Sequence, residues 1–414
     1  MSKFGPRAVL MLGAVAILSC KAPVPAAGSD RSIHGDGGKA LQAEGEVIPL
    51  PAVVRDLVSV RAGQRVLASG DVRIEPGGRL ELGAGVIARF ARGKGLYVRG
   101  GQLVVHGTAT ERVIFTSASE TPMPADWCGL IFDSTDAAAD RAEPLPGNLL
   151  EHVVVEFAGQ PWTYDGDEKR AAGISIEGYP RSPERGVLAA PITLKGVEIR
   201  NNESRGIDGQ SNSPVTAEEL VLGRNGGVSM RIDVGLADQL AGAATETVEI
   251  LGNLRRPLQL PARSVPYVVV ESLRVGSSAG LPVAILTIPP GTVLKFKRGT
   301  DLRVGGYFAG GIAARGVTFT SAEADPQPGD WAGIFVEDQG SGDFSDDTFE
   351  YAGANEFPAI FSSIDGSRRL KITNSRFRRN GGPSIGEPVS CDKWRSPKLK
   401  NVFDDKPFCK RNKR

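Results

Sequence analysis

One stretch of the chain occurs twice, 204 residues apart. Residues 115–132 read FTSASETPMPADWCGLIF and residues 319–336 read FTSAEADPQPGDWAGIFV, with nine of the eighteen aligned positions identical. The correspondence continues on both sides, and its spacing shrinks from 206 residues (Phe90 to Phe296) to 178 residues (Arg200 to Arg378). Each change in spacing falls between strand-like pieces, where loops tolerate insertions. The fold must therefore accept duplication of a whole block of about this size.

Within each block, apolar and polar residues alternate. In VLKFKRGTDLRV (293–304), Leu294, Phe296, Leu302 and Val304 share one side, and the basic residues between them take the other. A period of two predicts half-buried strands, and the 52 glycines suit the tight turns between short strands. The best helical candidate is the segment 233–251, although its glycines weaken that prediction. We therefore expect an all-β protein.

Many short strands are compatible with a sandwich, a propeller or a β-solenoid, and the turns favour the solenoid. The strings RNN (200–202), GRNGG (223–227) and RRNGG (378–382) each follow a short apolar strand. Asn and Gly readily adopt left-handed backbone conformations, which suits one turn that recurs in every coil. A single coil cannot bury its inner face alone, so coils must stack, and duplicating a block simply lengthens the stack.

The strings LTIPPGTVLKFKRGTDLRVGG, VTFTSA, GDWAGIFV and FEYAG resemble those of right-handed parallel β-helix proteins of the pectin-lyase-like superfamily. More narrowly, they resemble large lipoproteins and surface proteins of Gram-negative bacteria. The resemblance covers most of residues 47–390 and implies a single right-handed parallel β-helix, with block one at about 47–232 and block two at about 257–390. This superfamily contains both enzymes and non-catalytic proteins, so the resemblance leaves the activity open.

The N-terminus has the features of an export signal. Lys3 and Arg7 precede the apolar run AVLMLGAVAIL (8–18), which is too short to span a bilayer comfortably. Cys20 follows directly in a string that resembles the lipobox of bacterial lipoproteins, in which this residue is lipidated; the alternative is an ordinary secretory signal with an incidental cysteine. Residues 1–20 are thus predicted to be the signal and 21–46 a flexible tether. The Lys21 that follows suggests, by resemblance to other lipoproteins, the outer membrane.

Export implies an oxidising compartment, where disulfides persist. Cys391 and Cys409 bracket a short C-terminal segment, and their spacing suits a local disulfide. Cys128 is then left over in an apolar strand, where a buried free thiol behaves as a small hydrophobic side chain. Its counterpart in block two is Ala332, which favours a packing role over a reactive one.

Asp126 and Trp127 in block one recur as Asp330 and Trp331 in block two. We expect both Trp side chains to be packing anchors and both Asp side chains to cap a turn through hydrogen bonds. The alternative is a catalytic role, but a catalytic centre usually needs one copy, whereas a recurring geometry needs both.

Pectin-hydrolysing relatives carry an Asn-Thr-Asp string, an Asp-Asp pair, a His-Gly and an Arg-Ile-Lys string. Of these, the chain has two Asp-Asp pairs, at 346–347 and 404–405, and His-Gly at His34 and His106. It lacks the other two strings, so the catalytic constellation is not assembled. The acidic string TYDGDEKR (163–170) faintly resembles part of a calcium loop without a matching run of ligands. We therefore expect no catalytic site, no metal and no cofactor.

The best candidate for ligand binding is the part in which block one is longer. It contains Trp162, Tyr164 and Tyr179, with the carboxylates of Asp165 and Asp167 beside them. Exposed aromatic rings next to carboxylates are suited to stacking on sugars and hydrogen bonding to them. The alternative is a loop whose aromatic side chains fold back on the flank of the solenoid.

Charge limits the choice of partner. Lys and Arg number 49 against 48 Asp and Glu, so nothing global favours nucleic acid. The tail 391–414 is basic and suits either contact with an anionic glycan or a cap over the last rung, which we favour. The sequence thus predicts a monomeric, non-catalytic lipoprotein of the bacterial envelope, membrane-anchored, with polysaccharide as its candidate ligand. The alternative is a polysaccharide lyase or glycoside hydrolase acting on an acidic glycan.

Overall fold

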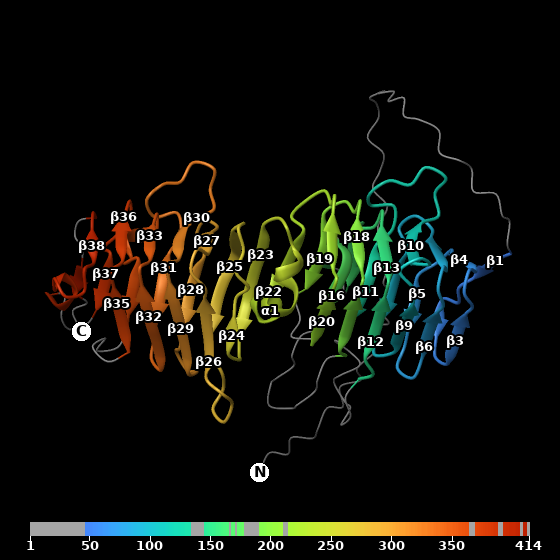
Figure 1. Ribbon diagram of the computed structural model, residues 1–414, viewed down its shortest axis with the longest axis horizontal. Coiled ribbons are helices and arrows are strands. Elements are labelled where there is room, and N and C mark those ends of the chain that lie inside the picture. The colour runs from blue at the N-terminus through green and yellow to red at the C-terminus, as the bar shows by residue number, and fades with distance from the viewer. Residues whose placement is uncertain are drawn as a thin grey trace, which may run out of the picture.

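The computed structural model describes residues 46–133, 145–164, 167–169, 172–177, 190–209, 214–363, 369–387, 392–405 and 409–411 of the chain. Short strands stack along one long axis, from β1 at one end to β38 and β39 at the other (Figure 1). In the described part of the chain, the strands of this stack pair in parallel, and each turn of the chain adds one rung. The protein is therefore an all-β parallel β-helix, which confirms the predicted fold class.

Three columns of strands form block one. The first column contains β1 (Val47–Pro49), β4 (Arg65–Ala68), β7 (Ile87–Phe90), β10 (Val113–Ser117), β13 (Val153–Glu156), β18 (Glu198–Arg200) and β21 (Val221–Gly223). The second contains β2 (Val53–Val54), β5 (Val72–Ile74), β8 (Gly95–Val98), β11 (Gly129–Asp133), β16 (Ala172–Glu177), β19 (Arg205–Gly209) and β22 (Met230–Asp233). The third contains β3 (Leu57–Val60), β6 (Arg79–Leu82), β9 (Gln102–His106), β12 (Asn148–Glu151), β17 (Ile192–Lys195) and β20 (Val215–Glu218).

Block two has three columns as well. One contains β27 (Val293–Phe296), β30 (Thr318–Ser321), β33 (Thr348–Glu350), β36 (Arg376–Arg378) and β38 (Val402–Phe403). The next contains β28 (Asp301–Val304), β31 (Gly333–Val336), β34 (Ile360–Ser362), β37 (Ile385–Glu387) and β39 (Cys409–Arg411). The last contains β24 (Leu258–Gln259), β26 (Ala284–Ile288), β29 (Gly310–Arg315), β32 (Gly340–Ser345) and β35 (Leu370–Thr373).

The two blocks join at β23 (Val248–Leu254) and β25 (Tyr267–Val275), which are long enough to pair in two columns each. The first part of β25 pairs with β27 and its last part pairs with β28. The register between β23 and β25 shifts between Ile250 and Gly252, where the two columns meet. The stack is thus continuous through the junction.

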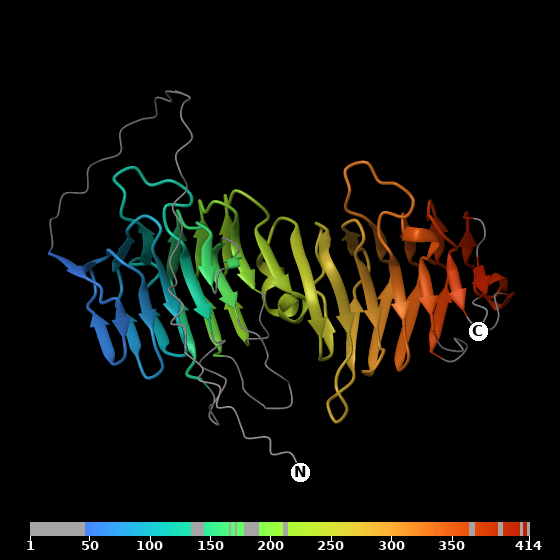
Figure 2. The same cartoon turned by 180° about the vertical axis from the view of Figure 1, so that it is seen from behind.

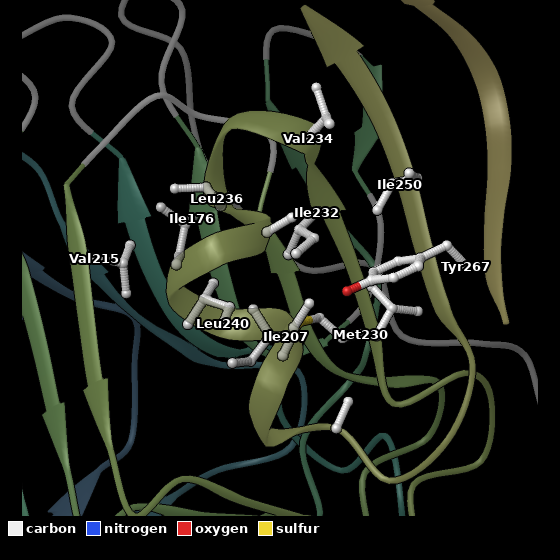
Figure 3. Close-up of a cluster of buried hydrophobic side chains, with 14 of the residues drawn as sticks. Ile176, Ile207, Val215, Met230, Ile232, Val234, Leu236, Leu240, Ile250 and Tyr267 are labelled. Carbon is white, nitrogen blue, oxygen red and sulfur yellow. The ribbon is translucent and has the colours of Figure 1, made fainter. Parts of the chain in front are cut away.

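The segment predicted as helical, 233–251, is helical only in its first part. It forms η2 (Val234–Leu236), α1 (Ala237–Leu240) and η3 (Ala241–Ala243), and β23 begins at Val248. Leu236 and Leu240 point into the core beside Ile176 and Ile207 (Figure 3). The helix is short because glycine interrupts it and the β-branched residues after it favour a strand.

The core is a column of apolar side chains shared by successive rungs. Phe319, Phe349, Phe377 and Phe403 stack along the axis of block two, with ring centroids 5.0, 4.7 and 5.3 Å apart. Rungs stack about 4.8 Å apart, so a ring in the same register of each rung meets its neighbour face on. At the C-terminal end, Trp394 of η5 (Asp392–Arg395) is 2% exposed and packs on this core.

The left-handed residue of the recurring turn is asparagine in only one of the three predicted strings. Asn201 has φ 55°, whereas Arg224 and Arg379 take this conformation in the other two strings, with φ 47° and 56°. The residue after Asn201, Asn202, accepts a hydrogen bond from the Ala158 N–H through its side chain. Asn380 does the same for Ala352 in block two. The side-chain amides thus satisfy backbone groups that the turn leaves unpaired between rungs.

Candidate functional site

Asp126 and Trp127 hold the loop between β10 and β11. The Asp126 carboxylate accepts a hydrogen bond of 2.7 Å from the Ser117 hydroxyl. The Trp127 indole is fully buried, donates to the Glu156 carbonyl at 2.8 Å and stacks on Phe90 with 4.4 Å between ring centroids. Both side chains thus hold the loop against the strands of the stack.

Asp330 and Trp331 make the same contacts in block two. Asp330 accepts from the Ser321 hydroxyl at 2.7 Å, and the Trp331 indole donates to the Glu350 carbonyl at 2.8 Å. The Trp331 ring stacks on Phe296 with centroids 4.1 Å apart. Because buried groups satisfied by their own fold have no capacity left for a substrate, these four residues serve the structure in both blocks.

The aromatic cluster predicted to bind sugar is not an exposed one. Trp162 and Tyr164 belong to β14 (Trp162–Tyr164), which pairs antiparallel with β15 (Asp167–Lys169). Trp162 is 1% exposed, so its ring is not available to stack on a sugar, and the prediction for this residue is wrong. Asp167 faces Tyr164 across the hairpin, and Asp165 and Tyr179 lie outside the described residues.

Trp162 instead covers the outer face of the solenoid. It meets Tyr97 edge on, with ring centroids 5.8 Å apart, and the two are buried with Cys128 and Ile131 in a cluster separate from the main core. Tyr97 and Ile131 are paired in register on neighbouring rungs. The hairpin β14–β15 therefore covers this pair of outward side chains, with the Trp162 ring edge on to Tyr97.

Cys128 is disulfide-bonded, so the expectation of a free thiol is wrong. Cys409 is disulfide-bonded too, whereas Cys391 and Cys20 lie outside the described residues. Cys128 precedes β11 in block one and Cys409 begins β39 in the last rung (Figure 1). Bonded cysteines have Cα atoms within about 7 Å, so these two do not bond to each other.

The Asp-Asp pairs do not assemble a catalytic centre. Asp346 is exposed and ion-paired with Arg315 at 3.6 Å, whereas Asp347 is buried in the turn and accepts from the Val317 N–H at 2.8 Å. Asp404 is ion-paired with Arg376 at 2.8 Å, one rung further along the stack. In block one, the His106 ring lies 3.7 Å from Glu151 on the third column, far from both pairs.

A concave feature of the described residues lies on block two. It is a groove of about 480 Å³ over the outer face of the column β28–β31–β34 and the turns that follow these strands. Its floor follows a ladder of side chains in register on successive rungs, of which Asn253, Arg274, Arg303 and Phe361 line the groove. Phe335, between Arg303 and Phe361 in this ladder, is 8% exposed and lies beneath the floor. Its wall is built by turn residues that include Tyr307, Phe308, Glu337 and Asp338.

In the groove, Arg303 contacts two carboxylates and one aromatic ring. Its guanidinium donates to Asp301 at 3.0 Å and to Glu337 at 2.9 Å, and it lies 4.8 Å from the centre of the Phe335 ring. Burial opposes the charge of Arg303, but the hydrogen bonds to the two carboxylates outweigh this and raise its pKa. Arg303 is therefore a fixed cation that flattens the floor over Phe335.

Three further residues of the groove have side chains that a ligand can contact. Arg274 is exposed, and in the described part of the chain no carboxylate forms an ion pair with it. Tyr307 is 97% exposed at the rim, and Phe361 lies on the floor with its ring 6.0 Å from Phe335. A cation and aromatic faces in one groove provide hydrogen-bond donors and stacking surfaces for a polar ligand with flat apolar faces.

The internal repeat shows how the two blocks cover the same outer positions. Arg303 and Phe335 occupy in block two the positions of Tyr97 and Ile131 in block one, and both pairs are in register on adjacent rungs. In block one, Trp162 covers the pair. Block two lacks the residues that form the hairpin, and there Phe335 is 8% exposed beneath the Arg303 guanidinium, with Phe357 edge on to its ring at 6.1 Å. Arg303 lies between this covered ring and the groove that it lines.

Sequence reasoning missed this groove because its floor comes from five different turns of the chain. One local signal was present, namely the string GGYFAGG (305–311), an aromatic pair between glycine pairs. Gly305 and Gly306 have φ of 92° and 86°, and a Cβ on Gly306 would lie 2.8 Å from a Glu337 oxygen. Glycine is required at this close turn, and the turn pushes Tyr307 into solvent.

Among the described residues, no three His, Cys, Asp or Glu side chains gather in a way that would hold a metal ion. No described helix has the length and apolar character needed to cross a membrane.

No protein-family model matches the chain, and no curated protein matches it. Among solved structures, the chain is similar to the catalytic domain of a GH87 alpha-1,3-glucanase in complex with tetrasaccharides. The two are 9% identical, the TM-score is 0.31, and the match covers 88% of this chain and 64% of that domain. The chain thus spans less than two thirds of the length of that domain.

Proposed function

We propose that the protein is a non-catalytic binding or scaffold protein whose groove on block two binds polysaccharide. The observation that carries the proposal is the groove of about 480 Å³ that Arg274, Arg303, Tyr307 and Phe361 line together. A pyranose ring presents a flat C–H face and a rim of hydroxyl groups. The first suits Phe361 and Tyr307, and the second suits the arginines and Glu337.

A stacked ladder suits a polymer better than a single sugar. The groove extends along the stack from Asn253 to Phe361, whose positions are in register over successive rungs. Rungs repeat about every 4.8 Å and sugar units of an extended chain repeat at a similar spacing, so several units can lie along one column. The proposal therefore concerns a linear glycan lying along the solenoid axis.

A second candidate is a lyase or hydrolase acting on an acidic glycan, and one observation favours it. The groove gathers two carboxylates, Glu337 and Asp338, with the basic side chain of Arg274. However, Glu337 is engaged by Arg303 and Asp338 is exposed, accepting a hydrogen bond of 3.1 Å from the Ser363 hydroxyl. Glycoside hydrolysis needs one carboxylic acid and one carboxylate facing each other across the bond, so we place binding first.

We also propose that the protein is a lipoprotein of the pectin-lyase-like superfamily, anchored at Cys20 in the bacterial cell envelope. The lipobox-like string and the short apolar run before it support the anchor. The absence of Asp after Cys20 supports the outer membrane, where the solenoid would face the periplasm or the exterior.

The test is binding of the full-length protein to immobilised polygalacturonate, alginate and a neutral glucan. We expect binding to at least one of them, weakened about tenfold by Arg274→Gln and by Phe361→Ala, because stacking and charged contacts of this kind contribute about 1–2 kcal/mol each. The matched control is Arg73→Gln. Arg73 pairs in register with Tyr97 in block one, as Arg274 pairs in register with Arg303 in block two.

Two outcomes would contradict the proposal. If Arg73→Gln and Arg274→Gln weaken binding equally, the groove is not the site. If the wild-type protein releases unsaturated or reducing-end products and Glu337→Gln abolishes their release, the enzyme candidate replaces the binding protein.

A further inference from the structure

An uncharged surface lies beside the groove. Residues 275–294 and 304–314 contain no charged side chain, in a chain of which 23% is charged. The two stretches are neighbours in space, because β26 pairs with β29 and Ser277 forms a bridge to Ala309. The chain thus brings its uncharged segments together at one edge of the solenoid.

This edge projects and exposes apolar side chains. The loop that precedes β26 extends past the rim of the solenoid in both views (Figures 1 and 2). Its side chains Leu281 and Val283 are 50% and 46% exposed, and Ile285 on β26 is 40% exposed. Phe308, on the adjacent turn, is 49% exposed. Contiguous exposed apolar residues of this kind mark an interaction surface and not a solvated one.

The loop is held in its projecting form. The Ala284 N–H donates to the Ser277 hydroxyl at 3.1 Å, and the Ser277 N–H donates to the Ala309 carbonyl at 3.0 Å. Gly276 leaves room for Phe308, whose Cβ would lie 2.9 Å from a Cβ at that position. Hydrogen bonds therefore fix the base of the loop, and its tip is exposed.

We propose that this apolar edge, formed by Leu281, Val283, Ile285 and Phe308, inserts into the interface of an anionic lipid bilayer. A projecting tip can enter a planar surface, whereas the flat sheet faces cannot. Arg255 and Arg274 line the same groove as Phe308, so they can meet lipid phosphates once the tip is inserted. Apolar and aromatic side chains in front of arginines match the layered chemistry of a membrane interface.

The test uses a tryptophan introduced as Leu281→Trp in the full-length protein. The native residues Trp127, Trp162, Trp331 and Trp394 are at most 2% exposed, so lipid cannot reach them. We expect the added Trp to shift its emission to shorter wavelength, and to be quenched by brominated lipid, on vesicles of phosphatidylglycerol and phosphatidylcholine. Adding Val283→Asp should remove the shift, and Arg274→Gln should weaken vesicle binding about fivefold.

The matched control is Met123→Trp. Met123 is 56% exposed and lies in the loop between β10 and β11, which projects from the opposite edge (Figures 1 and 2). Because the readout is local, a lipid anchor elsewhere in the chain does not produce it. Equal quenching of both added Trp residues, or no quenching of Leu281→Trp, would overturn the proposal. Glycan binding is measured separately, and its failure leaves this result unaffected.

Discussion

The carboxyl group of Asp347 is buried at a turn position that suits a neutral side chain. It is 1% exposed, and one of its oxygens has no hydrogen-bond partner among the described residues. Burial raises its pKa to about 7, against the hydrogen bonds from the Val317 and Ser345 backbone that lower it. The corresponding turn position one rung on is Ser375, and the next is Asn401, both neutral.

We predict that Asp347→Asn stabilises the protein at neutral and higher pH. The folded state holds a proton on Asp347 that the unfolded chain releases near pH 4, so its contribution to stability is lost as the pH rises from about 4 to about 7, by about 4 kcal/mol. Denaturant unfolding of both proteins between pH 3 and 8 measures this. The exposed neighbour gives the control, since Asp346→Asn should show no such trend. A difference between Asp347→Asn and wild type that does not grow with pH would contradict the prediction.

The indole of each repeated Trp makes one buried hydrogen bond that phenylalanine cannot make. We predict that Trp331→Phe costs about 1–3 kcal/mol, because the Glu350 carbonyl loses its donor while the ring still covers Phe296. Trp127→Phe should cost a similar amount in block one, where the partner is the Glu156 carbonyl. Urea denaturation of the two variants checks this, and a variant as stable as wild type would show that the bond contributes nothing.

Strands and rungs were the part of the structure most readily predicted from the sequence. The alternation in VLKFKRGTDLRV placed Leu294, Phe296, Leu302 and Val304 inside, and all four are buried. The groove was not predictable, because its floor depends on which residues of different rungs share a register. Arg274 meets Arg303, and Arg303 meets Phe335, only because each intervening turn has a particular length. An antiparallel hairpin over the outer face, which buries Trp162, likewise leaves no signal in an alternating pattern.

The last rung needs a cover because its core face and strand edges would otherwise meet water. Trp394 of η5 supplies the cover, and Lys393 lies 4.3 Å from the centre of its ring. We predict that Trp394→Ala costs about 3–5 kcal/mol and speeds hydrogen exchange first in β36 and β38. Lys393→Ala, which leaves the ring in place, should cost less than about 1 kcal/mol. Uniform loss of protection along the whole solenoid would argue against a local cap.

At the level of the chain, the disulfides decide whether Cys20 is available as the proposed lipid anchor. Cys128 and Cys409 are both disulfide-bonded, lie in different blocks and do not bond to each other. The chain has four cysteines, so the partner of Cys128 is Cys20 or Cys391. Lipidation would use the sulfur of Cys20, and a disulfide would use the same atom. One molecule cannot carry both modifications at this residue.

We predict that Cys128 resists alkylation in the folded or denatured protein until a reductant is added. Peptide mapping without reduction then identifies the cysteine bonded to Cys128. The result tests both the predicted Cys391–Cys409 pair and the lipid anchor at Cys20. A bond to Cys391 leaves Cys20 as the remaining cysteine for Cys409, so it contradicts both the predicted Cys391–Cys409 pair and the lipid anchor. A bond to Cys20 retains that pair but ties the N-terminal segment to the flank of block one, beside Trp162, and contradicts the lipid anchor. Alkylation of Cys128 without reductant would contradict the disulfide itself and leave both predictions standing.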